Sequence, residues 1–276
     1  LAVEGRGDYS RSILSQLTVA FKKAGKEHLQ CKKRPWKIRF ANEQAIDAGG
    51  PTRELMTEVA SSIFEPTTQV FIPVPNSRTG NGPNKDTFIP FDKNGTRAPD
   101  YATIGTYLGI VLRTGFAQDL PFAPIVWKYL AKETITAADI YAIDSALEEQ
   151  MKNIQTNCEL EYTQWQIESW DGTMTILPGH SPGTLVKPEE ASQYVHEVIA
   201  YRIATLKPML KVMRTAFRAN IGFNTHPLLT GKLLARMAQG SPVIATEHLK
   251  AITVVTDYDG LNDPYIVRFW RAIDRF

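Results

Sequence analysis

Apolar residues recur every three to four positions over much of the chain, which is the spacing of a helix with one buried face. In the first such segment, Ile13, Leu17 and Phe21 fall on one side. Thr52 is expected to cap the backbone amides of the second helix, and Pro208 to kink or divide a later one because it lacks an N–H. The spacing predicts helices over residues 10–24, 52–64, 101–114, 124–131, 138–154, 188–220, 228–237, 246–251 and 264–276.

Other segments follow different patterns. Residues 36–40 alternate apolar and basic side chains, which predicts a strand with one buried face. Residues 162–170 and 173–177 are aromatic or β-branched, and the Asp171-Gly172 dipeptide between them suits a tight hairpin. Residues 71–100 are rich in Pro, Gly, Asn and Asp, which predicts a long exposed loop. The pattern alone therefore indicates a mostly helical domain with an inserted hairpin.

Composition and charge exclude several classes of protein. The 276 residues include 31 Lys and Arg against 29 Asp and Glu, so the formal charge is 31 − 29 = +2. Nucleic-acid-binding proteins usually show a strong basic excess, so no nucleic-acid partner is expected. With 43% hydrophobic and 22% charged residues, the composition is that of a globular protein. No apolar run approaches the roughly 20 residues needed to cross a bilayer, so no membrane association is expected.

Candidate reactive groups are few. Cys31 and Cys158 are too few for a disulfide framework in a chain this long, so a reducing compartment is expected, the cytoplasm or alternatively the nucleus. The histidines at 28, 180, 196, 226 and 248 lack the paired spacing of a zinc site. Gly231-Lys232 lacks the remaining residues of a phosphate-binding loop. We therefore expect neither a metal site nor a cofactor.

A series of short motifs resembles one protein family along nearly the whole chain. Residues 46–54 read I-D-A-G-G-P-T-R-E and, after the predicted strand, resemble the D-A-G-G-x-[ST]-[RK]-E turn of HECT ubiquitin ligases. Gly105 and Gly109, followed by D-L-P-F at 119–122, resemble that family's next segment, in which close helix packing would require the glycines. The A-D-I at 138–140, the 171–172 hairpin, A-F at 216–217, Gly240, Leu249, T-D-Y at 256–258 and F-W at 269–270 continue the resemblance in order.

Two departures from the family pattern stand out. The family has a Gln shortly before its A-F pair, which this chain lacks. Its thioester-forming cysteine lies in an L-P-x-x-x-T-C segment well beyond F-W, and neither Cys31 nor Cys158 has that context. We therefore interpret these residues as part of a longer protein, with no catalytic residue of their own, and expect them to be inactive alone.

The resemblance implies an α+β, predominantly helical fold: the N-lobe of a bilobed HECT domain. A large helical subdomain would comprise residues 1–135 and 203–253, and a small inserted α/β hairpin subdomain would comprise 136–202. Residues 254–262 would form the hinge, and 263–276 the first helix of the C-lobe. Thr256, Asp257, Tyr258, Asp259 and Gly260 are the predicted hinge residues, with a plain surface turn as the alternative.

The resemblance also implies a function in two steps. A ubiquitin-charged conjugating enzyme would dock on the small subdomain and pass ubiquitin to the ligase cysteine, and the ligase would pass it to a substrate lysine. The partners implied are the conjugating enzyme, ubiquitin, and protein substrates bound through regions outside these residues. The predicted walls of the docking groove are Leu147, Met151 and Ile154 on one helix and Tyr194 and Val198 on the next; the alternative is that these residues are core.

Two other functions stay open at this point. The chain could be a non-catalytic scaffold that binds ubiquitin or a partner protein without ligase chemistry. It could also be a hydrolase that uses Cys31, since the basic neighbours of that residue would lower its thiol pKa.

Overall fold

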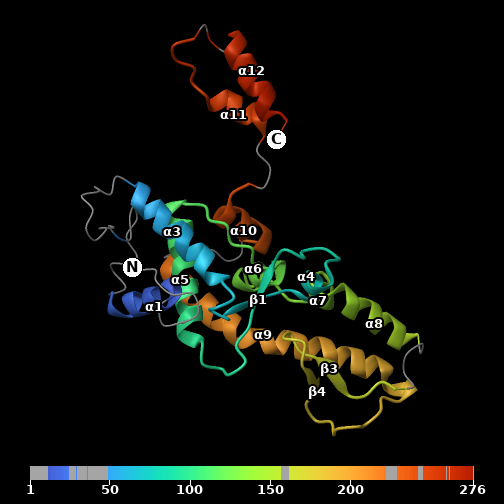
Figure 1. Ribbon diagram of the computed structural model, residues 1–276. Helices are drawn as coiled ribbons and strands as arrows, with labels where there is room; N and C mark the ends of the chain where they lie inside the picture. Colours follow the sequence, from blue (N-terminus) through green and yellow to red (C-terminus); the bar gives the residue numbers. More distant parts are fainter. Residues whose placement is uncertain are drawn as a thin grey trace. The chain divides into compact units, whose positions relative to one another are not determined.

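The computed structural model describes residues 12–24, 29, 36, 49–156, 162–221, 229–241, 245–258, 260 and 262–275. Helices predominate and are accompanied by two small antiparallel sheets, which confirms the expected α+β, predominantly helical class (Figure 1). The chain divides between Gln239 and Gly240 into two compact units. No helix in the described part of the chain has the length and apolar character of a membrane span.

Two long helices, α5 (Ala98–Thr114) and α9 (Ala191–Ile221), form the centre of the first unit. They approach closely at two glycines of α5, Gly105 and Gly109. A Cβ atom on Gly105 would stand only 2.2 Å from the carbonyl oxygen of Met213 on α9. Because no side chain fits at such a distance, the prediction that these glycines allow close helix packing is confirmed.

Among the described residues, four further helices pack around this pair (Figure 1). The helix α1 (Ile13–Lys23) packs on α5 and on α3 (Gly50–Ile63), while α6 (Pro124–Leu130) packs on α9 and on α10 (Gly231–Gln239). Their buried side chains belong to one hydrophobic core that also includes α5 and α9. All four helices lie where the apolar spacing predicts them.

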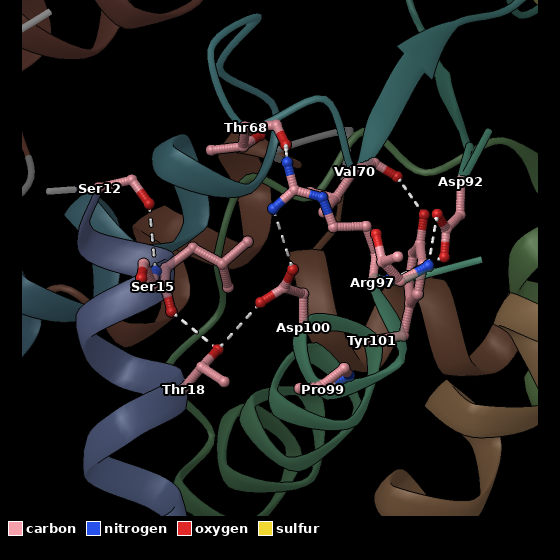
Figure 2. A network of polar contacts seen from close by, with 12 residues as sticks. Ser12, Ser15, Thr18, Thr68, Val70, Asp92, Arg97, Pro99, Asp100 and Tyr101 are labelled. Atoms are coloured by element: carbon pink, nitrogen blue, oxygen red, sulfur yellow. Dashed lines mark hydrogen bonds and ion pairs between the residues drawn. The ribbon is translucent and has the colours of Figure 1, made fainter. Parts of the chain in front are cut away.

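A buried polar network connects α1 to the start of α5 (Figure 2). The Thr18 hydroxyl lies 2.9 Å from the Leu14 carbonyl oxygen and 3.3 Å from a carboxylate oxygen of Asp100. The other Asp100 oxygen lies 3.4 Å from the Arg97 guanidinium, which also donates to the Thr68 carbonyl at 3.0 Å. These contacts hold α1, α5 and the residue 68 turn together around one buried carboxylate.

The predicted cap at Thr52 is wrong, because α3 begins two residues earlier, at Gly50. Gly49 precedes it with a φ of 121°, a conformation that suits glycine. Pro51 lies in the first turn, where its missing N–H costs no helical hydrogen bond. Thr52 is consequently buried inside the helix instead of standing at its end.

Residues 71–100 are not a long exposed loop as predicted. The strand β1 (Phe71–Pro73) pairs antiparallel with β2 (Phe88–Pro90), and the short helix α4 (Pro75–Thr79) lies between them. The side chains of Phe71 and Ile89 are buried in the core. The strands are three residues long and end in proline, so no two-residue period could appear in the sequence.

The helix predicted over 138–154 is divided in two, α7 (Ala137–Tyr141) and α8 (Ser145–Gln155). Asp144 separates the two helices, because its side chain accepts a hydrogen bond from the Leu147 amide at 3.1 Å and thereby caps the start of α8. A capping box between Thr136 and Asp139 starts α7.

The predicted hairpin is confirmed. The strand β3 (Gln166–Glu168) pairs antiparallel with β4 (Met174–Ile176), and Gly172 in the turn has a φ of 87°. An isolated antiparallel bridge connects Gln164, just before β3, with Leu185.

The helix α9 is continuous despite Pro208, after a single 3-10 turn, η2 (Pro188–Glu190). Pro208 is exposed, so its ring projects into solvent. The predicted subdomain boundary at 202/203 falls inside this helix, which runs without interruption from the hairpin region into the centre of the first unit.

The second unit consists of α11 (Thr246–Ile252) and α12 (Pro264–Ile273). Lys250 on α11 pairs with Asp274, which directly follows α12, at 3.5 Å. The unit begins at Gly240, so the predicted hinge at 254–262 lies inside it, between its two helices.

Several sequence predictions fall outside the described residues. They are the strand at 36–40 except for Trp36, both cysteines and Asp259. Trp36 itself is half-buried, with its ring centroid 6.1 Å from that of Phe21.

Candidate partner-binding site

The five residues predicted to line a docking groove are all in the core. Their exposed fractions lie between 0% and 4%. These residues therefore take the core position that the sequence left open as the alternative, because an apolar stripe on a helix serves a core and a groove equally well and here meets other buried side chains. Their role in binding a conjugating enzyme stays a prediction. They are Leu147, Met151, Ile154, Tyr194 and Val198.

Tyr194 shows how the hairpin closes over this part of α9. Its hydroxyl donates to the Gln166 carbonyl of β3 at 2.8 Å, and its ring lies edge-on to Trp165, with centroids 5.7 Å apart. Burial raises the pKa of Tyr194 to about 12, because the phenolate would lose its hydration. The residue is thus a structural contact between β3 and α9.

A buried ion pair joins α8 to α9. Arg202 Nη2 lies 3.1 Å from Asp144 Oδ2, and both side chains are almost fully buried. Burial raises the pKa of the Asp144 carboxyl, and the charge of Arg202 opposes that rise. Two other guanidinium nitrogens of Arg202, Nε and Nη1, have no hydrogen-bond partner among the described residues.

The same joint includes the hairpin. The Arg202 guanidinium lies 4.2 Å from the ring centroid of Trp170, a favourable cation–π distance. The Trp170 indole N–H donates to the Thr205 hydroxyl at 2.9 Å. Asn76 on α4 accepts from the Ser145 amide at 2.8 Å. Elements from both predicted subdomains therefore meet at one packed junction.

A second aromatic contact holds the loop that follows β4. The His180 ring stacks on Trp165, with centroids 3.7 Å apart and planes inclined by 5°. Its Nε2 lies 2.8 Å from a carboxylate oxygen of Glu197 on α9. Partial burial acts to raise the pKa of Glu197, but hydrogen bonds from Gln193 and His180 outweigh it, so that pKa lies below its usual value.

Exposed apolar residues do gather in this region, on the hairpin segment itself. Four side chains between residues 162 and 185 are 37% to 81% exposed. Met174 and Ile176 alternate along β4 with Thr175, so they project from the face opposite to buried Ile167 and Trp165. The two-residue alternation after Gly172 is the sequence signal that could have identified this face. The four residues are Tyr162, Met174, Ile176 and Leu185.

The predicted hinge residues that the structure describes, all but Asp259, lie in a bend of the chain where Thr256, Asp257 and Tyr258 are exposed. Asp257 has a φ of 66° and Gly260 one of 87°. Positive φ at a non-glycine residue is uncommon and marks a tight change of chain direction. The structure places these residues between α11 and α12.

Metal ligation has no candidate in the described part of the chain, where no three His, Cys, Asp or Glu side chains gather around one point.

The sequence is similar to those of several known proteins. The chain is similar to the human E3 ubiquitin-protein ligase HERC2, with 26% identity over 278 residues that cover 98% of this chain and 6% of HERC2. It is also 26% identical to the Neurospora crassa E3 ubiquitin-protein ligase TOM1-like over 245 residues, and 24% identical to Arabidopsis thaliana E3 ubiquitin-protein ligase UPL1 over 253 residues. Each of these two matches covers 87% of this chain, and they cover 6% and 7% of the relatives.

The family profile described as HECT-domain (ubiquitin-transferase) matches residues 57–276, far more than half of the chain. The match includes the first unit from residue 57 onward, with the hairpin and the glycines between α5 and α9, and the whole second unit. The chain thus belongs to the HECT-domain family of ubiquitin transferases.

Proposed function

We propose that this chain is the part of a HECT ubiquitin ligase that docks a ubiquitin-charged conjugating enzyme. The family match and the relatives named as E3 ubiquitin-protein ligases support the proposal. The chain spans 6% of the length of human HERC2, so the activity of the whole ligase is part of the proposal.

The proposed reaction has two acyl transfers. The thiolate of the ligase cysteine attacks the thioester carbonyl that joins ubiquitin to the conjugating enzyme, and the thiolate of that enzyme leaves. The amine of a substrate lysine then attacks the new thioester, loses a proton, and releases the ligase thiolate. We propose that the ligase cysteine lies outside these 276 residues.

The proposed location of the ligase cysteine has a direct test. The chain alone, incubated with a charged conjugating enzyme, is expected to form no ubiquitin adduct sensitive to dithiothreitol on a non-reducing gel. An adduct that disappears in a Cys31→Ser or Cys158→Ser variant would overturn it.

The docking surface that we propose is the exposed apolar face of residues 162–185. One observation carries this choice: Tyr162, Met174, Ile176 and Leu185 are exposed within a segment whose other large apolar side chains are packed. Interfaces are centred on apolar and aromatic side chains that lose contact with water on binding. One of the buried residues first predicted to line the groove, Tyr194, donates a hydrogen bond to Gln166 of β3 and so holds the hairpin on α9.

Calorimetric titration against a panel of ubiquitin-conjugating enzymes tests this surface. The double variant Tyr162→Ser/Met174→Ser changes two exposed residues, so its fold should persist by circular dichroism. We expect it to weaken binding at least about tenfold. Tyr265→Ser in the second unit is the matched control, since that tyrosine is 70% exposed.

Two results would contradict the docking proposal. One is that no member of the panel binds the unmodified chain, which would favour a scaffold that binds other partners. The other is binding that the hairpin variant leaves unchanged.

A further inference from the structure

An uninterrupted stretch of the chain lacks acidic residues. Roughly one residue in ten is Asp or Glu overall, yet none occurs between Glu197 and Glu247. The stretch does contain basic residues, and all but the buried Arg202 are at least partly exposed. Those are Lys207, Lys211, Arg214, Arg218, Lys232 and Arg236.

Four of these residues form a stripe along α9. Lys207, Lys211, Arg214 and Arg218 are spaced four, three and four residues apart, which places them on one side of a helix. The Arg214 guanidinium lies 4.4 Å from the ring centroid of Tyr129 on α6. The stripe therefore follows the side of α9 that borders α6.

The helix α10 carries the remaining two basic residues, which have apolar neighbours on the same helix. Lys232 and Arg236 are four residues apart and so are Leu233 and Met237, so the basic and apolar pairs run in adjacent rows. Leu233 and Met237 are 42% and 43% exposed. The outer surface of α10 thus combines positive charge with accessible apolar area.

The helices α9 and α10 both pack against α6 (Figure 1). This packing brings the basic residues of α9 and those of α10 into one region of the first unit. A small hollow lies where the three helices meet, and its lining combines five apolar residues with two cationic side chains. Its lining residues are Leu130, Ala131, Lys132, Phe217, Arg218, Leu229 and Leu234.

The charges on this surface have few counter-ions. Lys207, Lys211, Lys232 and Arg236 form no ion pair with any residue that the structure describes. The acidic groups on the loop after α6 and on α7 already have partners, the first of them at the start of α10. Glu133 accepts from the Gly231 amide, and Asp139 lies 2.7 Å from Lys128.

We propose that this basic face, made of the exposed basic residues of α9 and α10 with Leu233 and Met237, binds an acidic segment of a protein partner. Charge complementarity selects an acidic occupant. The apolar row on α10 and the apolar residues that line the hollow favour a polypeptide with hydrophobic side chains between its acids. A net charge of only +2 lacks the global basic excess expected for nucleic acid. The proposal is independent of docking at residues 162–185.

Fluorescence anisotropy with a labelled peptide of Glu-Glu-Leu repeats tests the proposal on the full chain at low ionic strength. A peptide of Gln-Gln-Leu repeats and a DNA duplex are the comparison probes. The chain variants are Lys207→Glu/Lys211→Glu and Lys232→Glu/Arg236→Glu. The control is Lys22→Glu/Lys85→Glu, which changes the net charge equally at exposed lysines on other elements.

We expect the acidic peptide to bind, the Gln peptide to bind at least about tenfold more weakly, and added salt to weaken binding. Each variant on the basic face should raise the dissociation constant about tenfold, while the control changes it less than twofold. Absence of binding, equal loss in the control, or tighter binding of the duplex than of the acidic peptide would overturn the proposal.

Discussion

Gly105 carries the tightest contact between the two central helices. In a Gly105→Ala variant the new methyl group would meet the Met213 carbonyl at 2.2 Å, so α5 and α9 must separate. Overpacking of this kind typically costs about 1 to 3 kcal/mol. We expect urea denaturation to show a loss of about 2 kcal/mol in the free energy of unfolding.

Gly50→Ala is the matched control for that variant, because no atom of the described residues lies within 4 Å of the added Cβ and Gly50 already lies in a helix. Its stability should be unchanged or slightly higher. Equal stability of both variants would mean that the helices are not as close as described.

Asp139 makes the start of α7 dependent on pH. Partial burial acts to raise the pKa of its carboxyl, but hydrogen bonds from Lys128 and Thr136 outweigh it and hold the pKa below its usual value. A lowered pKa means that the carboxylate stabilises the folded chain above the unfolded pKa of about 4, and that this contribution is lost as pH falls through the folded pKa.

The Asp139→Asn variant should therefore be about 1 kcal/mol less stable at neutral pH, and the difference should shrink below about pH 4. Urea unfolding at a series of pH values measures this difference in the free energy of unfolding between the variant and the unmodified chain. Asp86→Asn, at an exposed residue without a described hydrogen bond, serves as the control. A difference that is constant with pH would show that the charge of Asp139 is not responsible.

Residue-level prediction from sequence succeeded where a local motif determines the geometry. Gly105 and Gly109 could be assigned because they match a glycine segment of the family, and the structure shows the close packing that requires them. The apolar stripe at Leu147 and Met151 could not be assigned to a groove or a core, because both require the same spacing. Only the neighbouring chain segments, here α9 and β3, decide between them.

At the scale of elements, α9 is the feature that joins the molecule. It contacts α5, α6, α7 and α8, and the small hairpin closes on its first half. Pro208 does not divide it, because Leu206, Met209 and Leu210 around that residue are anchored in the core. Tertiary packing thus outweighs the loss of one helical hydrogen bond.

A Pro208→Ala variant should restore a donor toward the Ala204 carbonyl and remove the ring, without disturbing the core. We expect a gain of about 1 to 3 kcal/mol in the free energy of unfolding, measured by urea denaturation. A lower stability would indicate that the proline shapes α9 for its packing on α5.

Long periodic elements were the predictable part of the fold. The helices α1, α5, α6 and α12 agree with their predicted ranges to within a few residues. The strands β1 and β2 were missed because three-residue strands ending in proline show no period. The break between α7 and α8 depends on the Asp144 cap and its ion pair with Arg202, which spacing does not reveal.

At the scale of the whole molecule, the division at Gly240 has a dynamic consequence. The ion pair between Lys250 and Asp274 links the two helices of the second unit. We therefore expect α11 and α12 to share one rotational correlation time in nitrogen-15 relaxation measurements. If α11 instead tumbles with α10 and differs from α12, the hinge lies at residues 256–260, as the sequence predicts.

Family membership was predictable from sequence, since collinear motifs extend over most of the chain. The positions of the exposed apolar face and the basic face were not predictable in this way. The exposed face at Met174 and Ile176 depends on which side of a hairpin meets α9. The basic face depends on α6 lying against both α9 and α10. Such surfaces result from packing between segments that are distant in the sequence.

We propose that a ubiquitin-conjugating enzyme docks on residues 162–185. Hydrogen–deuterium exchange of the chain, with and without a saturating conjugating enzyme that binds it, tests this most directly. We expect slower amide exchange in β3, β4 and residues 184–186, and unchanged exchange in α10 and α12. Protection confined to other elements, with unchanged exchange in the hairpin, would contradict the account.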